Sequence, residues 1–351
     1  MNAFPPAHEE QRTSRATGTG RSAARGFTLI ELMVGLVLGV IVLFALVTLF
    51  VNNSRMRREI DQASQQIENG RYALDLLRDD LHLSGYYGDA VPQQGYTVGT
   101  ATIPSICATT VAGLQFVAPP AALQWPAPVF GIAAGDAVPT CVSGATGGFK
   151  AGTDILVVRR TSTVPTTAAL TAGKVYVQST GCSTDLDQHK DFVLDLGSNA
   201  GTFAMTKRGC ATAGDIYELQ TRIYYVSNET IPTLRLLTLS GTSSANEALV
   251  QGIEDMRIEY GRDNVASDGA PDDFRKCLST VDPCVATDWG NTMAVRINLL
   301  ARNISTGVGY TDSKTYALGA GIVVGPFNDH YKRHAYTAVI RLMNPAGRRE
   351  I

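Results

Sequence analysis

The feature that most constrains this 351-residue chain is a long apolar run near its N-terminus. From Phe27 to Val51 the run contains one ionisable residue, Glu31. A helix over these residues, at about 1.5 Å per residue, is long enough to cross a hydrocarbon core of roughly 30 Å. We therefore expect a single membrane-spanning helix over residues 27–51.

Glu31 is the residue in this run that needs a partner, because a carboxylate inside a membrane segment is costly and is usually paired or functional. Cleavage between Gly26 and Phe27 would create an α-amino group four residues before Glu31, on the same face of the helix. The sequence around this junction closely resembles the pattern of type IV prepilins, with the small residue Gly26 before the junction, Phe27 after it and Glu31 as the fifth residue of the mature chain. This resemblance implies that a prepilin peptidase cleaves after Gly26 and methylates the amine of Phe27, and that Glu31 acts in assembly.

The stretch before the junction has the character of a leader. Residues 1–26 are polar, carry four arginines and show no periodic apolar face, so we exclude them from the fold. An ordinary secretory signal fits less well, because its apolar region runs about 7–15 residues and precedes the small-residue site. An uncleaved signal anchor stays open as an alternative.

Apolar periodicity continues beyond the run. One stripe recurs at alternating spacings of four and three: Met56, Ile60, Ala63, Ile67, Gly70, Leu74, Leu77 and Leu81. We expect residues 52–85 to continue the helix, to pack this stripe on the chain's own head and to stop at Gly85, with a free coiled coil as the alternative. Gly35 and Gly39 form a G-x-x-x-G pair, for which packing against other pilin helices is preferred to a specific dimer.

Composition and charge limit the classes of function. The chain is 44% hydrophobic and 18% charged, as in globular proteins, and its net charge of -2 gives no reason to expect nucleic acid binding. All six cysteines follow the apolar run, and an even number in a chain with a targeting signal suits an oxidising compartment. We therefore expect residues 86–351 to form a β-rich globular head outside the cytoplasm.

Strand signals fill the later part of the head. Residues 90–148 are rich in Pro, Gly, Ala and Thr and predict little regular structure. Strands are predicted over 154–159, 175–177, 216–226, 234–239, 256–260, 293–299 and 336–342. The run at 234–239 predicts a hairpin with the run at 216–226. The alternation in residues 256–260 predicts a sheet with one solvent-exposed (wet) face. Because the helix precedes all the strands, we expect an α+β fold of the type IV pilin-like class, with a long N-terminal helix packed on an antiparallel sheet.

The six cysteines allow fifteen pairings. We prefer the sequential one: Cys107 with Cys141, Cys182 with Cys210, and Cys277 with Cys284. The first pair brackets most of the irregular stretch, and the third would pin the loop that leads to Trp289.

Four blocks of the head resemble PilW-type minor pilins of type IV pili: residues 152–160, residues 252–261, Trp289 with residues 295–300, and residues 340–344. The resemblance implies a structural, non-enzymatic subunit that helps to initiate a pilus, stays at or near its tip, and supports adhesion and twitching motility. The implied partners are a prepilin peptidase, other minor pilins, the major pilin, a tip adhesin and the inner-membrane assembly platform. The implied location is the inner membrane with a periplasmic head, then the extracellular pilus tip. A minor pseudopilin of a type II secretion system is the close alternative.

Catalytic motifs do not stand out in the sequence. The five histidines include no H-E-x-x-H pair, and neither G-x-S-x-G nor G-x-x-x-x-G-K-[ST] occurs, so a membrane-anchored periplasmic enzyme is a remote alternative. His330 and His334 are four residues apart, but they precede a predicted strand and are not expected to bind zinc.

An acidic loop is the one candidate for a metal. Asp263, Asp268, Asp272 and Asp273 crowd a segment between two predicted strands and could supply oxygen ligands for calcium. They do not match the D-x-[DN]-x-[DN]-G pattern, and a solvated turn is the simpler interpretation. We therefore expect no cofactor, with calcium as a weak alternative.

Overall fold

The computed structural model describes residues 26–88, 105–114, 127–187, 190, 192–265, 267–278, 281–307 and 309–350. The predicted leader, apart from Gly26, and much of the predicted irregular stretch lie outside these ranges. The chain divides into two compact units, residues 1–57 and residues 58–351, which are considered separately below.

One long helix, α1 (Leu29–His82), confirms the helix predicted from the apolar run and from the stripe that follows it. Side chains from Leu29 to Val51 are exposed, and the search of the described residues finds in α1 a segment long and apolar enough to cross a membrane. The helix ends just before Gly85, whose φ of 70° is the left-handed conformation typical of a helix C-terminus.

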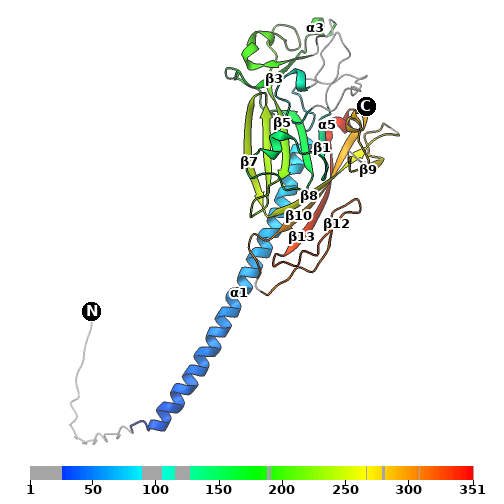
Figure 1. Cartoon of the computed structure of the whole chain (residues 1–351). Helices are drawn as coiled ribbons and strands as arrows, with labels where there is room; N and C mark the ends of the chain where they lie inside the picture. The colour runs from blue at the N-terminus through cyan, green and yellow to red at the C-terminus, as the bar shows by residue number, and fades with distance from the viewer. Residues whose placement is uncertain are drawn as a thin grey trace, which may run out of the picture. The chain divides into compact units, whose positions relative to one another are not determined.

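The second unit is built mainly of antiparallel strands (Figure 1). A seven-stranded sheet contains β1 (Val129–Ile132), β2 (Ile155–Thr161), β3 (Val175–Ser179), β4 (Phe192–Leu196), β5 (Ile216–Val226), β6 (Thr233–Ser240) and β7 (Ser243–Gln251). A four-stranded sheet has the order β13 (Arg333–Arg341), β10 (Thr292–Arg302), β8 (Ile253–Arg262), β9 (Asp273–Arg275). The pair β11 (Tyr316–Ala317) and β12 (Val323–Val324) forms a small third sheet. Short helical segments connect the strands: η1 (Ala112–Leu114), α2 (Thr140–Ser143), α3 (Ser183–Asp187), η2 (Gly197–Thr202), α4 (Ala286–Gly290) and α5 (Met343–Gly347).

The seven predicted strands correspond to β2, β3, β5, β6, β8, β10 and β13, and the predicted hairpin is the antiparallel pair β5 and β6. Two details differ from the prediction. The strands are divided between two large sheets, and β8 is largely buried on both faces. Its polar residues have partners there, since the buried Glu259 accepts from Arg296 at 3.3 Å and the half-buried Arg257 lies 2.8 Å from the buried Asp255. The α+β fold with a long N-terminal helix is therefore confirmed, but the single sheet with one wet face is not.

Within the head, α1 packs against both large sheets. Gln66 donates from Nε2 to the carbonyl oxygens of Ala301 at 2.8 Å, in β10, and of Lys332 at 3.0 Å, just before β13. Four turns later the buried carboxylate of Asp80 accepts from arginines of β2 and β5 at 2.5 and 2.8 Å. The helix is thus the element through which the two sheets share one core.

The predicted apolar stripe of α1 is only partly correct. Its later members Leu74, Leu77 and Leu81 are buried, but Met56, Ile60 and Ile67 are 62%, 61% and 44% exposed. A straight helix rotates by roughly 20° per heptad against a seven-residue repeat. A stripe that faces the head at its end therefore turns away from it several turns earlier.

The C-terminal segment of the chain caps the end of α1. Asn344 in α5 donates from its amide to the carbonyl oxygen of Ser84 at 3.0 Å, and Arg348 donates to that of Gly85 at 2.9 Å. Carbonyl groups at a helix C-terminus have no partner within the helix. Side chains of α5 and of the residue after it thus donate hydrogen bonds to backbone carbonyl groups just beyond the end of α1.

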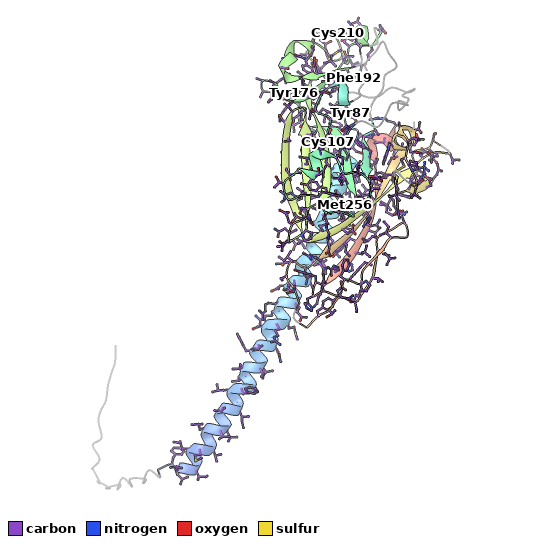
Figure 2. All side chains as sticks on the ribbon, viewed as in Figure 1. Tyr87, Cys107, Tyr176, Phe192, Cys210 and Met256 are labelled. Atoms are coloured by element: carbon purple, nitrogen blue, oxygen red, sulfur yellow. A yellow bond between two sulfur atoms is a disulfide. The ribbon has the colours of Figure 1, made fainter. Side chains whose placement is uncertain are left out.

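Most buried apolar side chains form one large core, which includes Met256 in the middle of the head (Figure 2). A smaller cluster contains Tyr87 and Phe192, which lie toward the end of the head that carries Cys210 (Figure 2). This second cluster packs between β3 and residues that follow α1. The end of the head that carries Cys210 thus has a small hydrophobic core of its own.

Candidate functional site

The predicted cleavage junction lies immediately before α1. The carbonyl oxygen of Thr28 accepts the N–H of Leu32 at 3.2 Å, which makes Thr28 the N-cap residue of the helix. The hydroxyl of Thr28 accepts the N–H of Glu31 at 3.3 Å, and one carboxylate oxygen of Glu31 accepts both the N–H and the hydroxyl of Thr28 at 3.0 Å. This reciprocal arrangement is a capping box.

The capping box gives Glu31 a local partner in the uncleaved chain. It also holds the carboxylate at the helix N-terminus, where the helix dipole favours negative charge. The Thr28 end of the box is separated from the bond between Gly26 and Phe27 only by Phe27. The capping role of Glu31 was not predicted above, although its signature is present in the sequence as a Thr followed three residues later by Glu, before an apolar run. Cleavage, methylation and the assembly role of these residues stay predictions.

The apolar surface that follows Glu31 is interrupted by two glycines. Apart from the adjacent backbone of the helix itself, no atom of the described residues lies within 4 Å of the position that a Cβ would occupy at Gly35 or at Gly39. These two positions share one side of the helix, where a second helix could approach the backbone closely.

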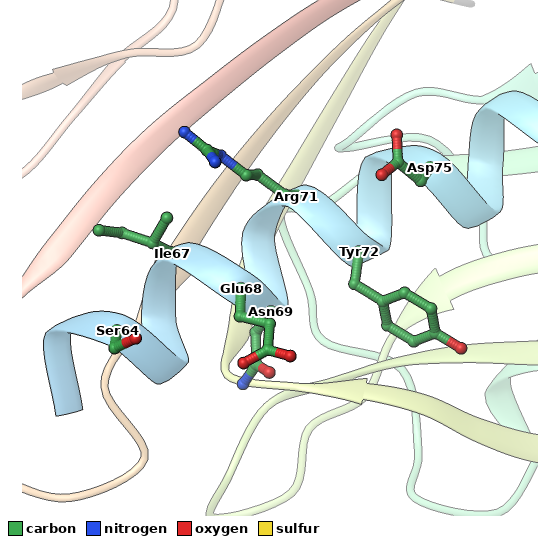
Figure 3. A pocket seen from close by; sticks show the side chains of 7 residues that line it. All are labelled: Ser64, Ile67, Glu68, Asn69, Arg71, Tyr72 and Asp75. Carbon is green, nitrogen blue, oxygen red and sulfur yellow. The ribbon is translucent and has the colours of Figure 1, made fainter. Parts of the chain in front are cut away.

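In the head, α1 leaves one face uncovered. A hollow of about 560 Å³ follows this face and is lined by Ser64, Ile67, Glu68, Asn69, Arg71, Tyr72 and Asp75 (Figure 3). Tyr72 is 54% exposed, and Figure 3 shows its ring and the side chain of Arg71 pointing to different sides of the helix. Aromatic residues and arginines are enriched in protein contact surfaces.

A second hollow of about 400 Å³ lies on the other side of Ile67 and Arg71. It is formed by α1 together with Tyr310, the residues before β13 and the first residues of that strand. The two hollows share Ile67 and Arg71, which form the ridge between them. This surface could not be predicted from the sequence, because its two walls are distant in the sequence.

The cysteines form three disulfide bonds, joining Cys107 to Cys141, Cys182 to Cys210, and Cys277 to Cys284. This is the sequential pairing that the sequence analysis preferred, and free cysteines are absent among the described residues. The bonds lie in the head, where they restrain connecting segments outside the long strands.

The acidic loop does not gather its carboxylates around one point. Asp263 accepts the N–H groups of Ser267 and Gly269 and pairs with Arg349 at 3.1 Å. Burial alone would raise the pKa of Asp263, but these N–H groups and the guanidinium outweigh it and lower the pKa.

The other three carboxylates of this loop also have separate partners. Asp272 accepts the N–H groups of Asn264 and Val265, Asp268 accepts that of Ala270, and Asp273 pairs with Arg262. The part of the chain that the structure describes contains no group of three acidic, His or Cys side chains that could hold a metal ion. The geometry fits a hydrogen-bonded turn better than the calcium site considered above.

The two histidines four residues apart also act separately. His330 contacts the carbonyl oxygen of Tyr310 through Nδ1 at 2.6 Å, and His334 lies edge-on to Tyr336 with ring centroids 4.7 Å apart. These contacts are made to protein groups on different neighbours and do not form a ligand pair.

The fold and the junction together define a type IV pilin-like protein: an exposed apolar helix that begins at a Gly-Phe junction with a carboxylate at the fifth position, followed by an antiparallel head. The family model for PilW, the type IV pilus-assembly protein W, matches residues 223–344, and the prokaryotic N-terminal methylation motif matches residues 21–47. These two matches support a PilW-type, prepilin-like protein. Searches of curated proteins and of solved structures found no match.

Proposed function

We propose that this chain is a minor pilin that helps to initiate assembly of a type IV pilus and stays at or near the pilus tip. The observation that carries the proposal is the presence, in one chain, of a prepilin junction matched by the methylation motif and a head matched by the PilW model. Both matches concern structural components of pili and point away from an enzyme. An apolar helix without proline, where many major pilins carry one, supports a minor subunit.

The proposed pathway begins in the inner membrane. A prepilin peptidase cleaves after Gly26 and methylates Phe27, while the helix holds the chain in the bilayer with the head in the periplasm. The disulfides support a head that folds in an oxidising compartment. The proposed partners are other minor pilins, the major pilin, a tip adhesin and the inner-membrane assembly platform, and the proposed outcome is support of adhesion and twitching motility.

Mass spectrometry of the membrane-extracted protein tests the first step. We expect a mature N-terminus at Phe27 that carries one added methyl group. A mature chain that starts at Met1, or at a residue after Val51, would contradict the prepilin assignment.

Deletion of the gene tests the role in assembly. We expect fewer surface pili and reduced twitching, both restored by the wild-type gene, with type II secretion unchanged. Normal piliation together with loss of type II secretion would instead assign the chain to a pseudopilin. Normal piliation and normal secretion would reject both assignments.

A further inference from the structure

The second hollow beside α1 is lined by positive charge. We call it the cationic groove and define it by Arg71 on α1, Lys314 in the loop before β11, and Lys332 before β13, with Tyr310 and Tyr336 as aromatic walls. Acidic residues are absent from its lining within the described part of the chain. The groove is therefore a concave surface that favours a negatively charged occupant.

Two of these cations have side chains that are not held by an ion pair with the described residues of the head. Arg71 and Lys314 are exposed, and neither side chain makes an ion pair or a hydrogen bond with a residue that the structure describes. Lys332 contacts Glu59 at 3.3 Å in a pair that is partly exposed on both sides. A pair of this kind contributes little to stability, so Lys332 is held only weakly by its own chain.

A fourth cation in the lining, Arg333, serves as an internal contrast. Its buried guanidinium is fully engaged by Glu254 at 2.5 Å, Asp312 at 3.0 Å and Asp329 at 2.6 Å. Arg333 therefore stabilises the head, whereas the charges of Arg71 and Lys314 remain available to a partner.

The walls of the groove suit a side chain with a short apolar stem. Ile67, Tyr310 and Tyr336 line the hollow beside the cations, and the Nζ of Lys332 lies 5.7 Å from the centre of the Tyr310 ring. Asp and Glu combine one or two methylene groups with a carboxylate, so an acidic peptide matches both features of the lining.

The neighbouring hollow argues against a membrane surface as the occupant. It shares Arg71 and Ile67 with the cationic groove but carries the carboxylates of Glu68 and Asp75 (Figure 3). A uniformly anionic lipid surface would be repelled by these carboxylates, whereas a peptide with its own pattern of charges can avoid them.

We infer that the cationic groove binds an acidic segment of a neighbouring pilin subunit. This inference rests on the proposed function, since it takes another pilin as the partner. The groove would fix the position of the neighbour by charge, next to the apolar contacts that Ile67 and Tyr72 offer on the exposed helix face.

Zero-length cross-linking tests the inference directly. A carbodiimide joins a lysine amine to a carboxylate that contacts it, so it should link Lys314 or Lys332 of the full-length protein, extracted from piliated cells, to an Asp or Glu of another pilin. Links from these lysines only to acidic residues of the same chain would overturn the inference.

Charge reversal provides the second measurement. The double variant Arg71→Glu and Lys314→Glu should reduce co-purification of the cross-linked pilin about tenfold, because like charges across an interface are strongly unfavourable. The matched control is Arg208→Glu, which reverses an exposed charge outside the groove and should leave recovery unchanged. Thermal unfolding of the double variant should match wild type, since both side chains are exposed.

The results also separate this inference from the proposed function. Normal recovery of pilins by the double variant would reject the groove while leaving the minor-pilin assignment intact, whereas wild-type protein that recovers no pilin would reject the assignment itself. Vesicles containing phosphatidylglycerol provide the lipid arm. If the wild-type protein binds these vesicles through the groove, the double variant should lose that binding. Such a loss with pilin recovery unchanged would identify a lipid headgroup as the occupant and overturn the inference.

Discussion

The backbone of Gly70 in α1 lies directly against the ring of Tyr336 in β13. A Cβ at Gly70 would stand 2.3 Å from Cε2 of that ring, and the Tyr336 hydroxyl donates to the carbonyl oxygen of Gln66 at 3.4 Å. The helix therefore meets the edge strand of the four-stranded sheet at a position where it has no side chain. This contact brings the first and last long elements of the head together and forms one wall of the cationic groove.

Gly70→Ala should destabilise the head. The added methyl group cannot fit unless the ring or the helix moves, and overpacking of this kind costs typically about 1–3 kcal/mol. Denaturant unfolding of the detergent-extracted protein measures the loss. Gly35→Ala is the matched control, because a Cβ there meets none of the described residues within 4 Å apart from the adjacent helix backbone. Equal stability of the two variants would show that the ring yields without cost.

Asp80→Asn should be more damaging still. The buried carboxylate of Asp80 accepts from Arg160 at 2.5 Å, from Arg222 at 2.8 Å and from the hydroxyl of Tyr224 at 2.8 Å. Removing one member of a buried charged group costs about 3–5 kcal/mol, because the remaining charges stay out of water without compensation. The neighbouring exposed Asp79→Asn should change the unfolding free energy by only a few tenths of a kcal/mol. A small effect at both positions would mean that water reaches the two guanidinium groups.

The strands and the junction could be predicted from sequence because their signals are local. β-branched runs and alternation mark β2, β5, β8 and β10 within a few residues each, and the pattern from Gly26 to Glu31 lies in consecutive residues at the start of α1. The division of the strands between two sheets could not be predicted in this way, since pairing depends on register between distant segments. The burial of Glu259 was also unpredictable, because its partner Arg296 lies on another strand.

The dependence on contacts between distant segments also explains which parts of the site could not be predicted from the sequence. The cationic groove joins Arg71 to Lys314 and Lys332, which have no spacing relation that a sequence motif could capture. The misplaced stripe of α1 has a different cause, because Ile60 and Ile67 keep the seven-residue pattern while the side of the helix that carries them rotates away from the head. Periodicity shows which side of a helix is apolar and not how far along it a partner extends.

The disulfides should differ in their contribution to stability. The bond between Cys107 and Cys141 closes a loop of 34 residues, and that between Cys277 and Cys284 closes one of 7. On chain-entropy estimates, replacing both cysteines of a pair by serine costs about 4 kcal/mol for the long loop and about 2 kcal/mol for the short one. Non-reducing denaturant titrations of the two double variants measure this order, and peptide mapping verifies the remaining bonds. The reverse order would contradict the estimate.

Asp329 should make the head sensitive to acid. Its hydrogen bonds with Arg333 lower the pKa of Asp329 below its ordinary value of 3.8. A carboxyl group whose pKa is lower in the folded state than in the unfolded state stabilises the protein at pH values above its unfolded-state pKa. That contribution is lost as the pH falls through the folded-state pKa. Asp329→Asn should therefore cost about 1 kcal/mol at pH 7, a modest amount because the side chain is 36% exposed. The difference from wild type should stay constant down to about pH 4 and shrink below it. A difference that grows on acidification would contradict the sign.

The last prediction separates two roles of Glu31. Its carboxylate caps the helix through Thr28 in the uncleaved chain, and after cleavage it can meet the amine of Phe27 or that of a neighbouring subunit. Glu31→Gln keeps an oxygen that can complete the capping box but removes the charge, whereas Glu31→Val removes both. We expect both variants to insert into the membrane and to be cleaved after Gly26 at nearly the wild-type level. We also expect both to lose pilus assembly, because an amine left unpaired in an apolar filament core costs about 3–5 kcal/mol.

Co-purification with other pilins and counts of surface pili, at equal expression, measure the effect of each variant. A loss of about 3 kcal/mol corresponds to a reduction in partner recovery of more than a hundredfold at equilibrium. If Glu31→Gln assembles normally and only Glu31→Val fails, the residue acts through the helix cap and not through its charge. If both assemble normally, Glu31 is a tolerated polar residue and has no role in assembly.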